Sequence, residues 1–317
     1  MCGIMGYTGT KSAERIILDG LYALEYRGYD SAGMAIAGPC GKIVKIKCRG
    51  RVSELEKEAA AENCSGSCGI GHTRWATHGA PTKENAHPHS SDTLTLVHNG
   101  IIDNCLNIKE ELEKEGYVFV SDTDTECIAH LTDREYKKLG DPAAALYSAC
   151  ERLRGSYALA VIFNDRPNEV YAVRKDNPLI LAIAEDGAYA ASDIPALLPY
   201  SREIIRSGED EVFCLRRDGA YFVSKNGEYE KRETEHFSLD VGAAGKDGYD
   251  FYMLKEIHEE PDAVFRTVSH RIGTDGLPDF SGDGIPDSLW RECDSVSIIG
   301  CGSATHAGLV GRFLIES

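Results

Sequence analysis

The chain has 317 residues and a formal net charge of −17, from 34 lysines and arginines against 51 aspartates and glutamates. Hydrophobic residues at 42% and charged residues at 27% are typical of a globular protein with a packed core, and the length suggests about two domains. The acidic excess excludes the electrostatic attraction that nucleic acids and anionic membrane surfaces require, so we expect neither as a partner.

The sequence indicates neither a membrane segment nor a signal peptide. No apolar run approaches the ~18–20 residues that cross a bilayer, and the first residues lack a basic start followed by an apolar stretch. We therefore expect a cytoplasmic protein. In that compartment the 11 cysteines should be mostly reduced, and their odd number and scattered spacing favour thiols over a disulfide framework.

Short strand-like segments alternate with helical ones from residue 2 to about residue 215. Apolar or alternating runs predict strands at 4–7, 31–37, 42–47, 94–98, 158–163 and 170–173. Helical periodicity predicts helices at 12–24, 105–115, 125–139 and 142–153. Thr123 and Glu126 have the spacing of a capping box before the third of these helices. The alternation favours an α/β or α+β fold.

A second unit is indicated after residues 238–248, where the composition shifts to Asp, Gly, Ala and Lys. Residues 249–271 are helical in character, and a loop rich in Gly, Asp and Pro follows at 273–287. The last segment predicts a strand at 296–299, a glycine turn and an apolar helix, which is half of a βαβ unit. Because partner strands are lacking, the sequence suggests the truncated start of a second α/β domain.

Cys2 is the first candidate for chemistry. If Met1 is removed, one residue carries both a thiol and a free α-amine, and an amine with a pKa near ~8 can act as the base for its own side chain. The alternative is an ordinary N-terminus. The residues that follow Cys2 run directly into a predicted strand, which would anchor the amine rather than leave it in solvent.

The run 72–79, His-Thr-Arg-Trp-Ala-Thr-His-Gly, offers a site for a carboxylate. Arg74 presents a fork of donors that matches a carboxylate, and Trp75 could close a pocket beside it. A metal site is an alternative, since histidines lie at 72, 78, 87 and 89, but their spacing matches no standard ligand pattern. Hydrogen bonding within the loop is the simpler role for these histidines.

Two further clusters could complete a site for amide hydrolysis. Asn99 and Gly100 follow a predicted strand and could supply a side-chain amide and a backbone N–H to an oxyanion, although Asn-Gly alone is more typical of a hairpin turn. Asp122 or Asp124 could bind the α-ammonium of an amino acid while Arg74 binds its α-carboxylate. The same aspartates could instead cap a helix.

Together these motifs closely resemble the glutaminase domain of the glutamine:fructose-6-phosphate amidotransferase family. The residues that carry the resemblance are Cys-Gly-Ile at 2–4, Tyr-Arg-Gly-Tyr-Asp-Ser-Ala-Gly at 26–33, the run 72–79, Asn-Ala-His-Pro-His at 85–89, Val-His-Asn-Gly at 97–100 and Asp-Thr-Asp-Thr-Glu at 122–126. Trp-Ala at 75–76 differs from the Tyr-Ser of phosphoribosylpyrophosphate amidotransferases. The resemblance covers about residues 2–240 and continues through 249–257, which looks like the family's link to its sugar isomerase domain.

The resemblance implies an α+β fold, the αββα sandwich of an N-terminal nucleophile hydrolase, at 2–240. A linker and helical segment would follow at 241–290, and a truncated sugar isomerase (SIS) domain would begin at 291–317. Cys2 would attack the amide of glutamine, with Asn99 and Gly100 forming the oxyanion hole. The implied glutamine-binding residues are Arg74, Trp75, Thr77, His78, Asp124 and Arg27, and Ser303 would bind a sugar phosphate.

The implied function is a glutamine-dependent amidotransferase that passes ammonia to fructose 6-phosphate, giving glucosamine 6-phosphate and glutamate. The reaction needs no cofactor and no metal, and members of the family are usually homodimers. This chain alone should hydrolyse glutamine without making the aminosugar. Alternatives are a stand-alone glutaminase, a glutaminase domain serving another acceptor, and a ligand sensor without turnover, against which the intact Cys2, Asn99 and Gly100 argue.

Overall fold

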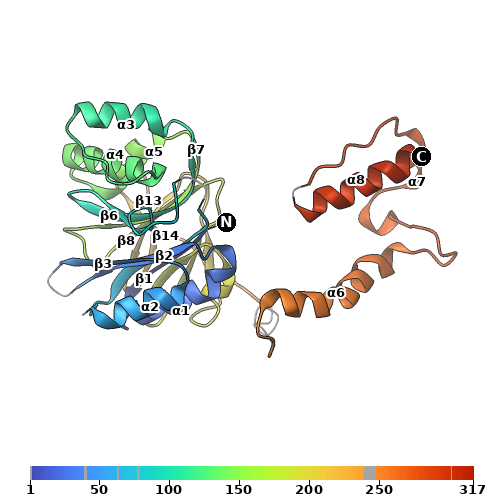
Figure 1. The fold of residues 1–317 in the computed structure, drawn as a ribbon, viewed down its shortest axis with the longest axis horizontal. Coiled ribbons are helices and arrows are strands. Elements are labelled where there is room, and N and C mark those ends of the chain that lie inside the picture. Colours follow the sequence, from blue (N-terminus) through green and yellow to red (C-terminus); the bar gives the residue numbers. More distant parts are fainter. Residues whose placement is uncertain (1, 39–40, 63, 77–78, 239–246, 301) are drawn as a thin grey trace. The chain divides into compact units, whose positions relative to one another are not determined.

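The computed structural model describes residues 2–38, 41–62, 64–76, 79–238, 247–300 and 302–317, apart from the side chains of Tyr252 and Asp287. The chain divides into two compact units, Met1–Gly245 and Lys246–Ser317. The first unit contains two β-sheets with helices on their outer faces (Figure 1). Among the described residues, no helix combines the length and the apolar character needed to cross a bilayer.

The larger sheet has eight strands in the order β15-β11-β9-β10-β1-β4-β2-β3, and every neighbouring pair is antiparallel. Its strands are β1 (Gly3–Gly9), β2 (Ser31–Ala37), β3 (Ile43–Arg49), β4 (Cys68–Arg74), β9 (Ile180–Ala184), β10 (Gly187–Ala191), β11 (Glu203–Arg206) and β15 (Glu235–His236). The strand β1, which follows Cys2 directly, therefore lies in the interior of the sheet between β10 and β4.

The second sheet has seven strands in the order β14-β13-β12-β8-β7-β6-β5, also antiparallel throughout. Its strands are β5 (His89–Ser90), β6 (Leu94–Ile102), β7 (Gly155–Phe163), β8 (Val170–Lys175), β12 (Val212–Arg216), β13 (Gly219–Val223) and β14 (Tyr229–Lys231). The strand β6 carries Asn99 and Gly100 near its end, and it pairs along its whole length with β7.

Three hydrophobic clusters separate the layers of this unit. One cluster packs α1 (Ala13–Leu24) and α2 (Val52–Ala61) against the eight-stranded sheet. A second packs α3 (Cys105–Lys114), α4 (Asp124–Leu139) and α5 (Pro142–Arg152) against the seven-stranded sheet. The third, which includes Ile4, Val97 and Ala160, lies between the two sheets. The unit is a four-layered αββα sandwich, so the α+β class expected from the sequence is confirmed.

Helix α1 packs unusually close to β1. Its predicted apolar stripe, which includes Ile17 and Leu21, is buried. Gly20 interrupts the helical pattern, and a Cβ at that position would lie 2.6 Å from the side chain of Met5. The glycine therefore lowers helix propensity but allows α1 to approach the strand that positions Cys2.

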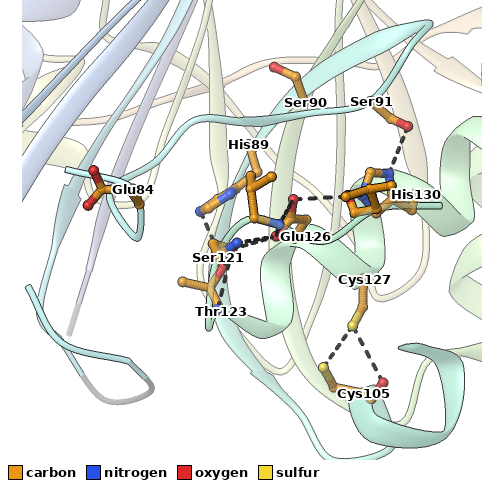
Figure 2. Close-up of polar contacts among 12 residues, drawn as sticks. Glu84, His89, Ser90, Ser91, Cys105, Ser121, Thr123, Glu126, Cys127 and His130 are labelled. Carbon is orange, nitrogen blue, oxygen red and sulfur yellow. Dashed lines mark hydrogen bonds and ion pairs between the residues drawn. The ribbon is translucent and has the colours of Figure 1, made fainter. Parts of the chain in front are cut away.

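The start of helix α4 differs from the prediction. Thr123 is the N-cap residue, but its side chain makes no capping hydrogen bond, so the predicted capping box is wrong. The carboxylate of Glu126 instead accepts hydrogen bonds from two backbone N–H groups in the loop before the helix. One is that of Ser121 at 2.8 Å (Figure 2). The other is that of Val120 at 3.0 Å. The physical reason is that Glu126 is buried, and a buried carboxylate requires several donors, which this loop supplies.

The second unit contains α6 (Tyr252–Val268), α7 (Asp287–Glu292) and α8 (Ser303–Glu316). The helical character predicted for 249–271 corresponds to α6 and the 3-10 turn Ser269–Arg271 that follows it. The strand predicted at 296–299 is wrong, since these residues belong to no strand. A strand needs a hydrogen-bonded neighbour, and the described part of this unit supplies none to them. The boundary predicted at 238–248 falls largely outside the described residues.

Candidate active site

A small pocket lies where residues from both sheets and the start of α4 meet. It is lined by Cys2, Arg74, Trp75, His87, His98, Gly100, Thr123, Asp124 and Thr125. Five of the predicted site residues are thus brought to one place. The free volume is about 20 Å³, which holds roughly one water molecule, so an amino acid can bind only if the lining segments separate.

The remaining predicted site residues fall into three groups. Arg27 and Asn99 do not line the pocket but bond the backbone of Cys2. Thr77 and His78 lie outside the described residues. Ser303 is the first residue of α8 in the second unit.

The sulfur of Cys2 lies beside the backbone of Trp75. Its Sγ is 3.3 Å from the Trp75 backbone nitrogen, which donates to it, and 3.6 Å from the Trp75 carbonyl oxygen, to which the thiol can donate. Burial raises the pKa of the Cys2 thiol, although the Trp75 N–H and the charges of Arg74 and Arg27 act in the opposite direction. A raised pKa means that the thiol needs a base before it can attack a substrate.

The carbonyl oxygen of Cys2 is held by two donors. Arg27 donates to it from Nε at 3.0 Å, and Asn99 donates from Nδ2 at 3.0 Å. Arg27 is itself buried and forms an ion pair with Asp193 at 2.9 Å, and the Tyr26 hydroxyl donates to the same carboxylate. These bonds fix the backbone of Cys2 from two sides and so fix the position from which its sulfur can act.

The orientation of the Asn99 side chain follows from its neighbours. A carbonyl oxygen can only accept, so Nδ2 of Asn99 must face Cys2, and it also donates to the Ser192 hydroxyl at 2.8 Å. The Oδ1 atom therefore faces His72, whose Nε2 lies 2.8 Å away and must carry the proton. Ser192 also accepts from the backbone N–H of Ile4 in β1 at 2.9 Å. His72 and Ser192 thus hold Asn99 against the strand that carries Cys2.

Gly100 occupies a position that only glycine tolerates. Its φ is 145°, in the region that L side chains rarely adopt, and a Cβ there would lie 2.0 Å from the carbonyl oxygen of Ser156 in β7. The alternative of a hairpin turn at Asn-Gly is excluded, because β6 continues through both residues to Ile102 and stays paired with β7. The two residues therefore place a side-chain amide and a strand backbone next to the pocket.

Two opposite charges line the pocket. The guanidinium of Arg74 is buried at the end of β4, where it donates to the carbonyl oxygens of Gly79 at 3.1 Å and Ala80 at 3.3 Å. Asp124 is the first residue of α4, and its Oδ2 accepts from the backbone N–H of Ile102 at 2.8 Å. A cation and an anion in one pocket match the carboxylate and ammonium groups of a free amino acid.

Four histidines at the pocket are buried: His87 and His98 line it, and His72 and His89 contact these residues or the pocket residue Thr123. The rings of His72 and His87 stack with centroids 3.9 Å apart. Burial lowers the pKa of His72 and of His89 to about 3, and it also lowers the pKa of His87 and of His98, so all four are neutral at pH 7. Among the described residues, no three His, Cys, Asp or Glu side chains are arranged to hold a metal ion.

Sequence reasoning overlooked several residues of this site. Ser192 carries no motif. It directly follows β10, and only the pairing of β10 with β1 shows that its hydroxyl bridges Ile4 and Asn99. In the sequence Thr125 belongs to a predicted helix start, yet its hydroxyl lies within hydrogen-bond distance of His87 at 3.3 Å and His98 at 3.0 Å. The sequence did contain one signal for His98, which lies at the end of a predicted strand and directly before the candidate oxyanion residue Asn99.

Comparison with known proteins gives matches of two kinds to the sequence. The family model described as a glutamine amidotransferase domain matches residues 72–199. The glutamine–fructose-6-phosphate aminotransferase (isomerizing) of Clostridium tetani is 44% identical over 319 residues, covering 100% of this chain and 52% of that protein. The enzyme of the same name from Clostridium acetobutylicum is 45% identical over 318 residues, with the same coverage of 100% and 52%. The chain spans about half the length of the curated relatives it matches.

Solved structures with a similar fold include a glutamine amidotransferase. The glutamine phosphoribosylpyrophosphate amidotransferase from B. subtilis, solved with ADP and GMP, matches with a TM-score of 0.59 and 26% identity over 75% of this chain and 50% of that one. A structure described as the allosteric regulatory enzyme of purine biosynthesis matches with a TM-score of 0.60 and 26% identity, over 76% and 50%. The resemblance drawn from the sequence motifs is confirmed by the two curated relatives and the family model, and the solved structures agree with the fold.

Proposed function

We propose that this chain, which carries a glutamine amidotransferase domain, uses it to hydrolyse the side-chain amide of glutamine. The observation that carries the proposal is that the Cys2 thiol, the Arg74 guanidinium and the Asp124 carboxylate line one pocket. The two charges suit the α-carboxylate and α-ammonium of an amino acid, and the thiol is a nucleophile for its side chain. We assign the first unit to the N-terminal nucleophile hydrolases, since its αββα layers and its relatives agree with that fold.

The proposed reaction begins with removal of Met1. The α-amine of Cys2 then takes the proton of its own thiol, and the thiolate attacks the amide carbon of glutamine. The tetrahedral intermediate carries an oxyanion, which the Gly100 backbone N–H and the Asn99 amide would stabilise. For this, the Asn99 amide must give up one of the two hydrogen bonds that it donates to the Cys2 carbonyl and the Ser192 hydroxyl. Collapse of the intermediate breaks the C–N bond, and the leaving nitrogen takes the proton from the α-amine and departs as ammonia. Water then hydrolyses the thioester to give glutamate and restore the thiol.

We propose that Arg74 binds the α-carboxylate of glutamine and Asp124 binds its α-ammonium. Thr77 and His78 would line the same pocket, Trp75 would control the exit of ammonia, and Arg27 would hold the backbone of the nucleophile. Thiol, amine and hydrogen-bond donors are sufficient for this acyl transfer, so we propose that it needs neither a cofactor nor a metal.

Fructose 6-phosphate is the ammonia acceptor that we propose for the whole protein, giving glucosamine 6-phosphate. The support is the name shared by relatives at 44% and 45% identity. We assign residues 2–240 to the glutaminase domain, 241–290 to a linker and helical segment, and 291–317 to the start of a sugar isomerase (SIS) domain. Ser303 would bind the sugar phosphate at the N-terminus of α8, where backbone N–H groups favour an anion.

The remaining features of the whole protein are also proposals. We expect a homodimer in the cytoplasm. The acidic composition argues against nucleic acid and anionic membranes as partners. The 317-residue chain alone should show glutaminase activity only. A stand-alone glutaminase, or a glutaminase domain serving another acceptor, would release the same glutamate, so the acceptor must be tested separately with the whole protein.

Glutamate release from glutamine, measured with the purified chain, tests the proposal. We expect turnover by the unchanged chain and none by Cys2→Ala, with Cys64→Ala, a buried cysteine away from the pocket, as the matched control. Mass spectrometry after treatment with a glutamine-analogue electrophile should find the label on Cys2 and Met1 absent. Glutamate release that persists in Cys2→Ala, or a label on another residue, would contradict the mechanism.

A further inference from the structure

Two cysteine thiols outside the pocket lie in direct contact. Cys105 is the first residue of α3, and Cys127 lies in the first turn of α4. Their sulfur atoms are 2.8 Å apart, and the Cys127 sulfur is 3.4 Å from the Cys105 carbonyl oxygen (Figure 2). Both residues are free thiols, as are the other cysteines that the structure describes.

The two thiols have different environments. Cys105 is half-buried, whereas Cys127 is fully buried. The hydrogen bond from Cys127 lowers the pKa of Cys105 against burial and the charge of Asp124, which both raise it. The charge of Lys109, one helical turn further on, adds to the lowering. Burial raises the pKa of Cys48, Cys64, Cys68, Cys150 and Cys214. Cys105 therefore combines a lowered pKa with partial exposure to solvent, and both properties favour reaction of a thiol.

We propose that Cys105 and Cys127 are a modification site that peroxides convert reversibly to a disulfide between α3 and α4. The half-buried Cys105 is the sulfur that meets the oxidant. Cys127, already in contact with it, is the resolving thiol.

A peroxide supplies the two oxidising equivalents that conversion of the two thiols to a disulfide requires. The Cys105 thiolate attacks one peroxide oxygen, the O–O bond breaks, and the leaving hydroxide takes up a proton to form water. The sulfur of Cys127 then attacks the resulting sulfenic acid, the S–O bond breaks, and the departing hydroxyl leaves as water with the Cys127 proton. Two thiols lose two electrons in total, and one peroxide becomes two waters. A dithiol reverses the bond by exchange.

The pair lies next to the segments that build the pocket. Cys127 is three residues after Asp124, so both lie in the first turn of α4. Cys105 is three residues after Ile102, whose backbone N–H donates to the Asp124 carboxylate at 2.8 Å. A disulfide of about 2.05 Å would draw the two sulfurs together by roughly 0.8 Å from 2.8 Å, and the starts of both helices would have to accommodate this shift.

We therefore expect the disulfide to weaken glutamine binding through Asp124, a consequence that rests on the proposed function. The bond from Ile102 is charge-assisted and sensitive to its geometry. A shift at either helix start should weaken the affinity for glutamine by about three- to tenfold.

The first test maps the bond itself. The full chain carrying Cys2→Ala, which removes the catalytic thiol as a competing target, is treated with hydrogen peroxide. We expect the intact mass to fall by about 2 Da, a cross-link between Cys105 and Cys127 in the peptide map, and recovery with dithiothreitol. The bond should persist with Cys64→Ala and be absent with Cys105→Ser or Cys127→Ala. Oxidation of both cysteines to sulfinic acids, or a map without this cross-link, would overturn the proposal.

The second test measures glutamine binding to the same Cys2→Ala protein by calorimetry, before and after oxidation. The dissociation constant should rise by about three- to tenfold on oxidation and return on reduction. Cys127→Ala, or Cys105→Ser if the buried Cys127→Ala variant does not fold, is the control that cannot form the disulfide. Peroxide should leave the glutamine affinity of this control unchanged. Equal affinities in the two redox states would refute the link to the pocket. Absence of glutamine binding in the reduced protein would instead count against the proposed function and leave the mapped bond intact.

Discussion

Replacement of His72 by phenylalanine should lower the kcat of glutamine hydrolysis without reducing the reactivity of the Cys2 thiol. His72 donates from Nε2 to Oδ1 of Asn99 at 2.8 Å and has no contact with Cys2 among the hydrogen bonds of the site. It is fully buried and neutral, because burial lowers its pKa to about 3, so phenylalanine preserves much of its volume and its lack of charge. The substitution removes one of the three hydrogen bonds that orient the Asn99 amide.

The expected magnitude lies between two limits. One neutral hydrogen bond contributes about 0.5–1.5 kcal/mol, which corresponds to roughly a tenfold change at most. Loss of an oxyanion donor altogether costs about 10²–10³ in kcat, which sets the upper limit. Because the Cys2 carbonyl and Ser192 still hold the Asn99 nitrogen, we expect a decrease of about tenfold in kcat, with KM for glutamine changed by less than about twofold.

The assay compares two reactions of one thiol. Glutamine hydrolysis passes through an oxyanion, whereas alkylation of Cys2 by iodoacetamide does not, so His72→Phe should slow the first and leave the second unchanged. His72→Gln, whose side-chain amide can also donate to Asn99, should recover part of the kcat. Equal slowing of both reactions would show that His72 acts on the thiol or on the fold instead. An unchanged kcat in His72→Phe would refute the argument that His72 orients Asn99.

Three further predictions concern substrate binding, backbone conformation and acid stability. Asp124→Asn should raise KM for glutamine by about 10- to 100-fold with a smaller effect on kcat, since it removes a charge-assisted bond to the ammonium; an unchanged KM in steady-state kinetics would exclude Asp124 from binding. Gly100→Ala should lower the free energy of unfolding in urea by roughly 2–4 kcal/mol, because its Cβ would lie 2.0 Å from the Ser156 carbonyl oxygen. Burial alone would raise the pKa of Glu126, but bonds from His130, Val120 and Ser121 lower it to about 2, below its ordinary value of 4.5. Its stabilisation is therefore present above about pH 5 and is lost as the pH falls toward 2, so Glu126→Gln should be less stable by up to about 3 kcal/mol at pH 7. This difference should narrow in acid, and a difference that is constant across pH would contradict the assignment.

Periodic and motif-bearing segments could be predicted from the sequence. The apolar stripe of α1 and the long pattern of α4 are locally strong, and the structure places these helices within one residue of the predicted starts. The short strands between residues 180 and 231 were missed, since such segments become strands only when distant neighbours pair with them. Helix α2 was missed as well, because its first turn follows a polar run rather than a capping residue.

Residues whose side-chain type suits the substrate were easier to predict than residues whose role depends only on contacts between distant parts of the chain. Cys2, Arg74 and Asp124 were candidates because a thiol, a guanidinium and a carboxylate suit an amino acid, and the pocket brings the three together. Ser192 accepts a hydrogen bond from Ile4, which is 188 residues away in the sequence, so no local pattern could indicate its role. The contact between Cys105 and Cys127 likewise depends on how α3 packs beside α4.

Helix α4 is buried without interruption from Thr125 to Tyr136. In hydrogen-exchange experiments, the backbone amides of such a helix should open only when the whole unit unfolds, so this segment should be among the slowest to incorporate deuterium. Asp124 is the first residue of this helix, so we expect it to stay in place when the pocket opens. Trp75, which follows β4 in another segment that lines the pocket, is 44% exposed. The room that an amino acid needs beyond about 20 Å³ should therefore come from the Trp75 side, and faster exchange there than in α4 would mark the entry route.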